Sequence, residues 1–305
     1  MVLFVCISLI LVLLRIVADS TTSDFAKWQH GGVNVDGIRI HFRYAGNSPP
    51  LILIHGNPQH SMDTYTVIAP DNRGMGDSML ALDNDYSAEA IARDVKGILE
   101  YLRINPTYVF AHGKGCGPAI TLATQHPGLV KGIGLGEYTL TGFGYEQTWS
   151  STYEWNINSN WQYAMFSVPE LATTSLTGRE KELLTWYFFH ASYPGANVIP
   201  EDVLNQYVTS IRKPSFLTAV LSPFAAYTVN ADLTIFNKTL HGKPLDIPAL
   251  VLGHWFADEN PLWVANKIKS FLGELRQDVN TPVVDLACMI VACYIEEALT
   301  VMIHC

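Results

Sequence analysis

The sequence predicts an α/β fold with a mostly parallel, doubly wound β-sheet and an inserted block of helices. Three observations lead to this fold class. Short continuous apolar runs have the length of strands that are buried on both faces. Amphipathic stretches with helical spacing separate several of these runs, and strands that alternate with helices favour a parallel sheet. A long segment rich in Trp, Tyr and Phe then interrupts the alternation.

The first two predicted strands form a hairpin. Residues Gly32–Ala45 hold two alternating apolar runs around Asp36-Gly37, a dipeptide that suits the positive φ angles of a tight turn. Five continuous apolar runs follow as predicted sheet strands: Leu51–Ile54, Tyr65–Ala69, Tyr108–Ala111, Gly132–Leu135 and Ala249–Leu252.

Helices are predicted between the strands and in the aromatic block. Ser87–Leu102 has apolar residues at helical spacing and a capping Ser87, and Gly117–Gln125 is a second helix. Within residues 148–239 we expect helices at 160–166, 180–190, 200–211 and 216–232. Such an insertion is a cap that would roof a pocket at the strand ends. The predicted division is a leader at 1–20, a core at 26–147 and 241–275, a cap at 148–240 and an unassigned apolar tail at 276–305.

Composition excludes several classes of protein. The chain is 49% hydrophobic with a net charge of -9, and its Lys and Arg residues are scattered, so we expect no nucleic-acid partner. The five cysteines are too few and too widely spaced for a disulfide framework or a zinc site. We expect no metal and no cofactor, and a small-molecule substrate or ligand as the partner.

The N-terminal residues have the character of a targeting segment. Met1–Leu14 is almost wholly apolar, and Arg15 and small polar residues follow it. The apolar run is shorter than the ~20 residues that span a bilayer. It fits the hydrophobic part of a signal peptide, although the basic residues that normally precede that part are missing. We expect a secreted or endomembrane protein. A membrane anchor and a wrongly assigned start are the alternatives.

Three motifs lie at the ends of predicted strands. His55-Gly56-Asn57-Pro58 follows the run 51–54, and Asp71–Ser78 has the pattern DxRGxGxS. The third, Val109–Gly117 (VFAHGKGCG), contains a strand end, a tight turn and a helix start. A strained strand-to-helix turn needs small residues two before and two after its centre, and Ala111 and Gly115 meet this need.

With these motifs in order, the sequence resembles the α/β-hydrolases of the epoxide hydrolase and haloacetate dehalogenase type over about residues 26–275. The resemblance implies the α/β-hydrolase fold. In those families the centre of the third motif is a nucleophilic Asp, but here it is Gly113. The resemblance also implies an oxyanion hole formed by the backbone N–H groups of Asn57 and Lys114. For Asp71–Ser78 it implies a structural role.

The general base and its orienting acid also follow from the resemblance. Gly253–Pro261 (GHWFADENP) resembles the segment that carries the base histidine, which makes His254 the candidate. The acid follows one of two strands in these families. There is no room for it between Leu252 and His254, so the candidate is Glu137, as in haloalkane dehalogenases.

Candidate binding residues come from the cap and the two turns. The related enzymes present Tyr or His and Trp side chains to an epoxide oxygen or a departing halide. The matching positions are Trp161, Tyr163 and Phe224, and Phe224 lacks the hydroxyl of a Tyr. His55 and His112 are further candidates. An aromatic core is the alternative interpretation of the cap residues.

The chain also departs from the family pattern in length. Between Pro58 and Tyr65 there is room only for a turn, although parallel neighbours need a crossover of a dozen or more residues. Leu252 is joined almost directly to His254, where the family has a further helix and strand. The tail after residue 275 matches nothing in the family. These losses indicate a degraded gene or an erroneous splice.

The function expected is that of a hydrolase by descent whose catalysis is impaired, because Gly113 offers no attacking group. Cys116 is a poor substitute because it would point into the helix. Two alternatives remain open. One is a working hydrolase in which His254 activates water for direct attack. The other is a non-catalytic protein that binds a small molecule in the capped pocket.

Overall fold

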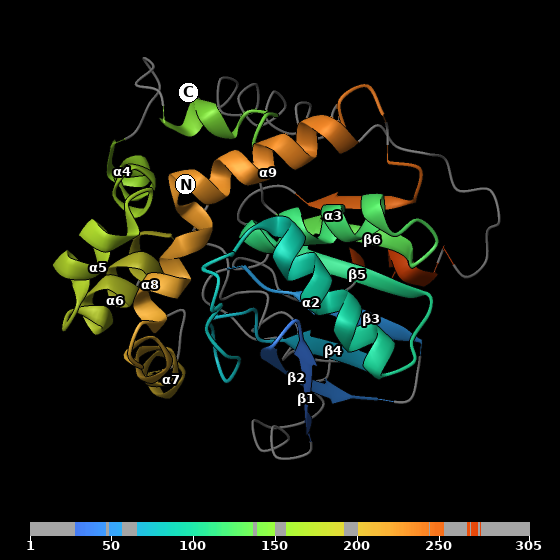
Figure 1. The fold of residues 1–305 in the computed structure, drawn as a ribbon, viewed down its shortest axis with the longest axis horizontal. Coiled ribbons are helices and arrows are strands. Elements are labelled where there is room, and N and C mark those ends of the chain that lie inside the picture. The colour runs from blue at the N-terminus through green and yellow to red at the C-terminus, as the bar shows by residue number, and fades with distance from the viewer. Residues whose placement is uncertain are drawn as a thin grey trace.

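A seven-stranded sheet organises the molecule (Figure 1). The computed structural model describes residues 28–46, 49–56, 66–136, 139–149, 157–191, 201–243 and 245–252, together with 267, 268, 270–273 and 275. The strand order is β1-β2-β4-β3-β5-β6-β7. From β4 to β7 all neighbours pair in parallel, whereas β1–β2 and β2–β4 are antiparallel. The strands are Gln29–Val35 (β1), Ile38–Ala45 (β2), Pro50–Ile54 (β3), Thr66–Pro70 (β4), Thr107–His112 (β5), Val130–Gly136 (β6) and Ala249–Leu252 (β7).

The predicted hairpin is confirmed as β1 and β2. Asp36 and Gly37 form the turn with φ angles of +50° and +85°, and Val35 pairs with Ile38 across it. Asn34 Oδ1 accepts the N–H of Gly37 at 2.8 Å, which fixes the turn locally. The Asp-Gly pair therefore has the positive φ angles that the sequence indicated.

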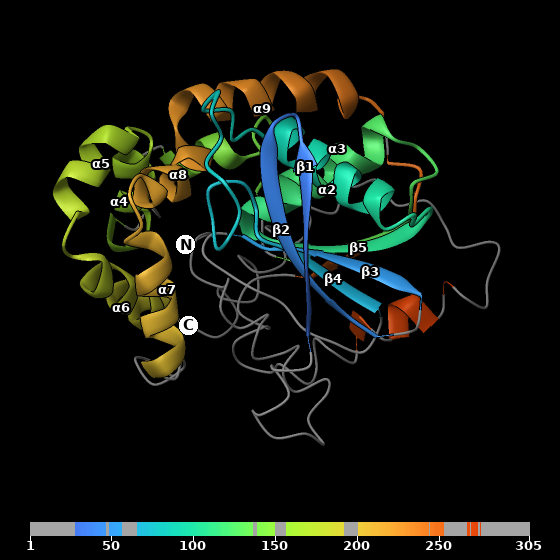
Figure 2. The ribbon, with the colours of Figure 1, turned by 60° about the horizontal axis from the view of Figure 1, so that its bottom comes forward.

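The central strands are buried on both faces, as their continuous apolar runs predicted. Alternate residues of β3 point to opposite sides, so that Ile52 and Ile54 join one hydrophobic cluster and Leu51 and Leu53 another. Helices α2, α3 and α9 cover the first face (Figure 2). On the other face, Ile268 and Leu272 from helical residues near 268–272 join the cluster that contains Leu51 and Leu53.

The two helices predicted inside the core are present. Helix α2 spans Ala88–Tyr101, and its capping Ser87 accepts the N–H of Ala90 through its side chain at 3.2 Å. Helix α3 spans Cys116–Gln125 and is buried along most of its length. Both lie on the same face of the sheet and contact each other.

Short helices gather beyond one end of the sheet (Figure 1). They are Ile157–Phe166 (α4), Pro169–Leu176 (α5), Glu180–Ala191 (α6), Glu201–Ile211 (α7) and Phe216–Leu221 (α8). Their buried side chains form a hydrophobic cluster separate from both clusters of the sheet. The sequence did not single out α5, which begins with a proline at a first-turn position. The boundaries predicted for this block, 148 and 240, stay a prediction.

The prediction of a single helix at 216–232 is wrong. The chain there forms α8, a 3-10 turn at Ser222–Phe224 (η5) and then α9 at Ala226–Thr239. Pro223 has no N–H to continue the hydrogen bonds of α8, and Ala225 adopts an extended ψ of 142°. Because of this break, α8 packs in the helical block while Phe236 of α9 packs against the sheet helices.

The regions where the sequence indicated losses are only partly described. β3 and β4 do pair in parallel, joined by residues 55–65. The leader 1–20, residues 253–266 and the tail 276–305 lie outside the described residues. Within the part of the chain that the structure describes, every helix is too short or too polar to cross a membrane.

A close approach at Gly115 joins the start of α3 to the end of β3. A Cβ added at Gly115 would lie 2.4 Å from the carbonyl oxygen of Ile54 and 2.7 Å from that of His55. Both are backbone atoms, which cannot move without displacing the strand. Only glycine therefore fits at this contact.

We predict that Gly115→Ala lowers the free energy of unfolding by at least about 2 kcal/mol, because overpacking against backbone forces a shift of strand or helix. Urea denaturation measures this change. Gly273→Ala is the matched control, since a Cβ at Gly273 meets no atom within 4 Å. Equal stability of Gly115→Ala and the native chain would contradict the packing described.

Candidate active site

The candidate site is built on the turn Gly113–Gly115 between β5 and α3, which we call the elbow. Strand β5 ends at His112, and Gly113–Gly115 form a 3-10 turn (η2) that leads directly into α3. Gly113 has a φ of +51°, in the left-handed region. A side chain is strained at that φ, with Asp and Asn the most tolerant. The predicted strand–turn–helix context is thus present, with an unstrained glycine at its centre.

His55 connects the ends of two neighbouring strands. It follows β3, and its Nε2 accepts the backbone N–H of Asn72 at 3.0 Å. Asn72 in turn donates from Nδ2 to the His55 carbonyl oxygen at 3.1 Å. The other ring nitrogen, Nδ1, carries the proton and contacts the carbonyl oxygen of Gly56. In this structure both imidazole nitrogens of His55 therefore hold the turn together.

The contacts of Asp71–Ser78 agree with the structural role implied for this motif. Arg73 is buried and forms a two-pronged ion pair with Asp94 of α2, at 2.7 and 2.8 Å. Ser78 donates to the carbonyl oxygen of Asp71 at 2.6 Å. A Cβ at Gly76 would lie 2.3 Å from the Asp71 carboxylate, so glycine lets the loop close over that side chain.

Lys114 turns its side chain away from water and into the protein. Its Nζ lies 4.5 Å from the ring centre of Tyr145 and 5.0 Å from that of Phe224. Both rings belong to segments outside the sheet, a 3-10 turn at Tyr145–Trp149 (η3) and η5. Cation–π attraction to these rings compensates part of the lost hydration. Burial lowers the pKa of Lys114 to about 8, and the negative charge of Asp232 opposes this shift.

Asp232 provides the compensating charge from α9. Its Oδ1 accepts the backbone N–H of Ala88 at 2.7 Å, at the N-terminus of α2, where the helix dipole favours an anion. Burial raises the pKa of Asp232 to about 6, against the opposing effects of Lys114 and the Ala88 N–H. Sequence reasoning missed Asp232 and Tyr145 because only the tertiary fold brings them to the elbow.

Two of the three predicted cap residues lie in the hydrophobic cluster formed by the short helices. Tyr163 and Phe224 are buried there, with ring centres 6.4 Å apart. Trp161 is partly exposed and meets Trp186 edge to face at 4.9 Å. His112 is buried at the end of β5. A binding role for these four residues stays a prediction.

Three predicted catalytic groups lie outside the described residues: Asn57, Glu137 and His254. The residues before the first two are described, since His55-Gly56 follows β3 and Gly136 ends β6. β3, β5 and β6 are parallel neighbours, and their carboxyl ends meet at one edge of the sheet. The strands from which Asn57, Gly113 and Glu137 extend are therefore adjacent.

The strand order and the elbow can now be compared with known proteins. A family model described as the alpha/beta hydrolase fold matches residues 49–162, which include β3, the Asp71–Ser78 loop and the elbow. The crystal structure of wild-type Cfl2 from Burkholderia cenocepacia superposes with a TM-score of 0.72 at 21% identity, over 80% of this chain and 95% of that chain. The chain has the α/β-hydrolase fold.

Sequence relatives of this chain include enzymes of two kinds. A soluble epoxide hydrolase from Corynebacterium sp. (strain C12) is 31% identical over 112 residues, which are 33% of this chain and 39% of that protein. A fluoroacetate dehalogenase from Burkholderia sp. is 22% identical, over 84% of this chain and 97% of that protein. The comparisons thus confirm two parts of the resemblance inferred from the motifs: the α/β-hydrolase fold, and similarity to epoxide hydrolases and dehalogenases.

We predict a pH-dependent effect for Lys114→Met, which removes the buried ammonium and keeps an unbranched side chain. Between pH 8 and 10.5 the Lys114 amine is protonated in the unfolded state but neutral in the folded state, because burial lowers its folded-state pKa to about 8. The free energy of unfolding of the native chain should therefore rise relative to the variant over this window, by roughly 3 kcal/mol.

Urea denaturation at several pH values measures the difference. Lys238→Met, at an exposed position of α9, is the matched control. A stability difference between Lys114→Met and the native chain that does not change with pH would show that the ammonium is hydrated in the folded protein.

Proposed function

We propose that this chain is an α/β-hydrolase of the epoxide hydrolase and dehalogenase type whose catalysis is impaired because the nucleophile position is Gly113. The observation that carries the proposal is the position of Gly113 between β5 and α3, at a φ of +51°. The elbow is built, but its central residue has no side chain with which to attack carbon.

The ancestral reaction needs that attacking group. A carboxylate at the elbow displaces the leaving oxygen or halide and forms an ester, which an activated water molecule then hydrolyses. In the proposed scheme His254 activates the water, Glu137 orients His254, and the N–H groups of Asn57 and Lys114 stabilise the oxyanion. With glycine at position 113 the ester cannot form, so the later groups have nothing to act on.

Cys116 does not replace the missing nucleophile. Its Sγ donates to the carbonyl oxygen of Gly136 at 3.5 Å, and the residue is 1% exposed. A nucleophilic thiol needs access to substrate and an environment that favours the thiolate. Loss of the nucleophile in a catalytic triad lowers kcat on the order of a millionfold and leaves roughly 10³–10⁴ over water. We expect a comparable loss here.

A second candidate function is small-molecule binding without turnover. It is favoured by the contacts of Lys114 with Tyr145 and Phe224, which keep the helical block packed on the elbow. A protein that retains this packing keeps the framework of a capped pocket even without chemistry. The ligand class would be that of the ancestral substrates, small apolar molecules with one polar group.

We predict that the native chain does not turn over epoxides or fluoroacetate, and that Gly113→Asp creates measurable hydrolysis of at least one of them. Product formation by the purified proteins is the measurement. Asp tolerates the left-handed φ at a cost of roughly 1–2 kcal/mol. Gly113→Asn is the matched control, because it has the same shape and the same backbone cost but no carboxylate.

The outcomes separate the alternatives. Turnover by the native chain would refute the proposed impairment and favour direct attack by water. Equal activity of the Asn and Asp variants would refute the role of position 113. Thermal stabilisation of the native chain by an epoxide or a diol, without turnover, would favour the binding function.

A further inference from the structure

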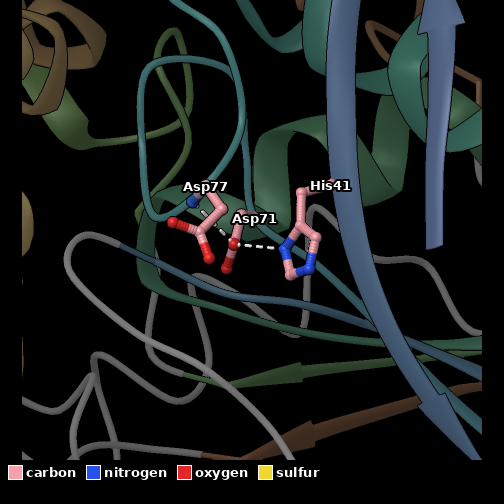
Figure 3. Close-up of side chains that lie close together, drawn as sticks. All are labelled: His41, Asp71 and Asp77. Atoms are coloured by element: carbon pink, nitrogen blue, oxygen red, sulfur yellow. Dashed lines mark hydrogen bonds and ion pairs between the residues drawn. The ribbon is translucent and has the colours of Figure 1, made fainter. Parts of the chain in front are cut away.

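A cluster of potential metal ligands lies at β2 and the end of β4 (Figure 3), and β3 separates β4 from the elbow strand β5. His41 lies on β2, and Asp71 is the first residue after β4, the strand beside β2. The register pairs Phe42 with Pro70, which brings Asp71 next to His41, and the Asp71 N–H donates to the His41 carbonyl oxygen at 2.9 Å. The antiparallel pairing therefore fixes both side chains.

Asp77 joins this pair because its loop folds back. Gly74 and Gly76, with φ angles of +70° and +53°, reverse the chain so that the N–H of Asp77 donates to Asp71 Oδ2 at 3.0 Å. One donor atom each of His41, Asp71 and Asp77 then lies within 4.8 Å of the others. Figure 3 shows the three side chains close together, with Asp71 between Asp77 and His41.

The spacing of these donor atoms suits a first-row transition metal. Ligand bonds of about 2.0–2.2 Å place tetrahedral ligands roughly 3.3–3.6 Å apart. The closest pair, His41 Nδ1 and Asp71 Oδ2, is now a hydrogen bond of 2.7 Å. Small rotations of the side chains would lengthen the distance between these two atoms and shorten the distances to Asp77, so that all three donors could reach one ion. One imidazole nitrogen with two carboxylates favours Zn²⁺ over Mg²⁺ or Ca²⁺, which prefer oxygen ligands alone.

The surroundings of the cluster also match those of metal sites. A metal-bound His generally donates its other ring N–H to an acceptor, and His41 Nε2 lies 2.9 Å from Nδ1 of His30 on β1. With an ion on His41 Nδ1, the ring proton lies on Nε2 and is donated to His30. Bound carboxylates are likewise held by hydrogen bonds. The backbone N–H of Asp77 holds Asp71, and Lys213 Nζ holds Asp77 Oδ1 at 3.1 Å.

We propose that His41, Asp71 and Asp77 bind a divalent transition-metal ion of the Zn²⁺ class, and that His30 orients His41 for this role. The sequence alone predicted no metal, because His41 on β2 lies 30 residues before the loop that carries Asp71 and Asp77, and the three form no recognisable spacing. The Asp77 side chain is 58% exposed, so the ion enters from its side and keeps a position for water.

Zinc titration of the full chain by calorimetry, after treatment with a chelator, tests the proposal. We expect one site of this kind that excess Mg²⁺ does not compete for. His30→Ala should weaken Zn²⁺ binding by about 10- to 100-fold, the usual effect of losing the partner of a ligand. Asp77→Asn should weaken it at least as much, because it removes a charged ligand at an exposed position. Asp83→Asn, also exposed, is the matched control and should bind as the native chain does.

Lys213→Met separates ion binding from a structural role of the loop. It removes a cation that holds Asp77, so Zn²⁺ should bind more tightly, whereas a loop that needed the ion pair would bind less well. Thermal unfolding of each variant without metal checks that the fold is retained. Absence of Zn²⁺ binding by the native chain, or binding that Asp77→Asn and His30→Ala leave unchanged, would overturn the proposal.

Discussion

The start of α3 packs directly against the backbone at the end of β3. Gly115 lies against the carbonyl oxygens of Ile54 and His55, with no room for a Cβ. Two residues earlier, Gly113 takes the positive φ that turns β5 into α3. These two requirements fix the strand ends relative to one another, and with them every group that the fold could direct at a substrate.

Two buried charged residues, Lys114 and Asp232, lie where η3, η5 and α9 pack near this turn. Lys114 projects from the elbow beneath Tyr145 and Phe224, and Asp232 of α9 lies near enough to counter the lowering of its pKa. Asp232 also accepts the N–H of Ala88 at the start of α2. Between about pH 6 and 8 both side chains are ionised while buried.

The sequence predicted the elements whose structure depends on neighbouring residues. It did not predict groupings of residues that only tertiary contacts bring together. The hairpin agrees with the prediction because Asp36-Gly37 adopts the positive φ angles of a tight turn. The central strand agrees because the apolar run 51–54 is buried on both faces. Pro223 divides a continuous apolar pattern into two helices, because one missing N–H outweighs the periodicity. Asp232 and His41 belong to no motif, since their partners lie on distant segments, and the motif Asp71–Ser78 predicted only a structural role for Asp71 and Asp77. Asn57, Glu137 and His254 stay predictions.

We propose that the elbow between β5 and α3 keeps its geometry while Gly113 leaves it without the group that forms the ester. Mass spectrometry of the intact chain after incubation with excess epoxide tests this most directly, because an ester intermediate adds the mass of one substrate molecule. We expect no ester adduct on the folded native chain. A stoichiometric increase that maps to the peptide containing Gly113–Cys116 would contradict it.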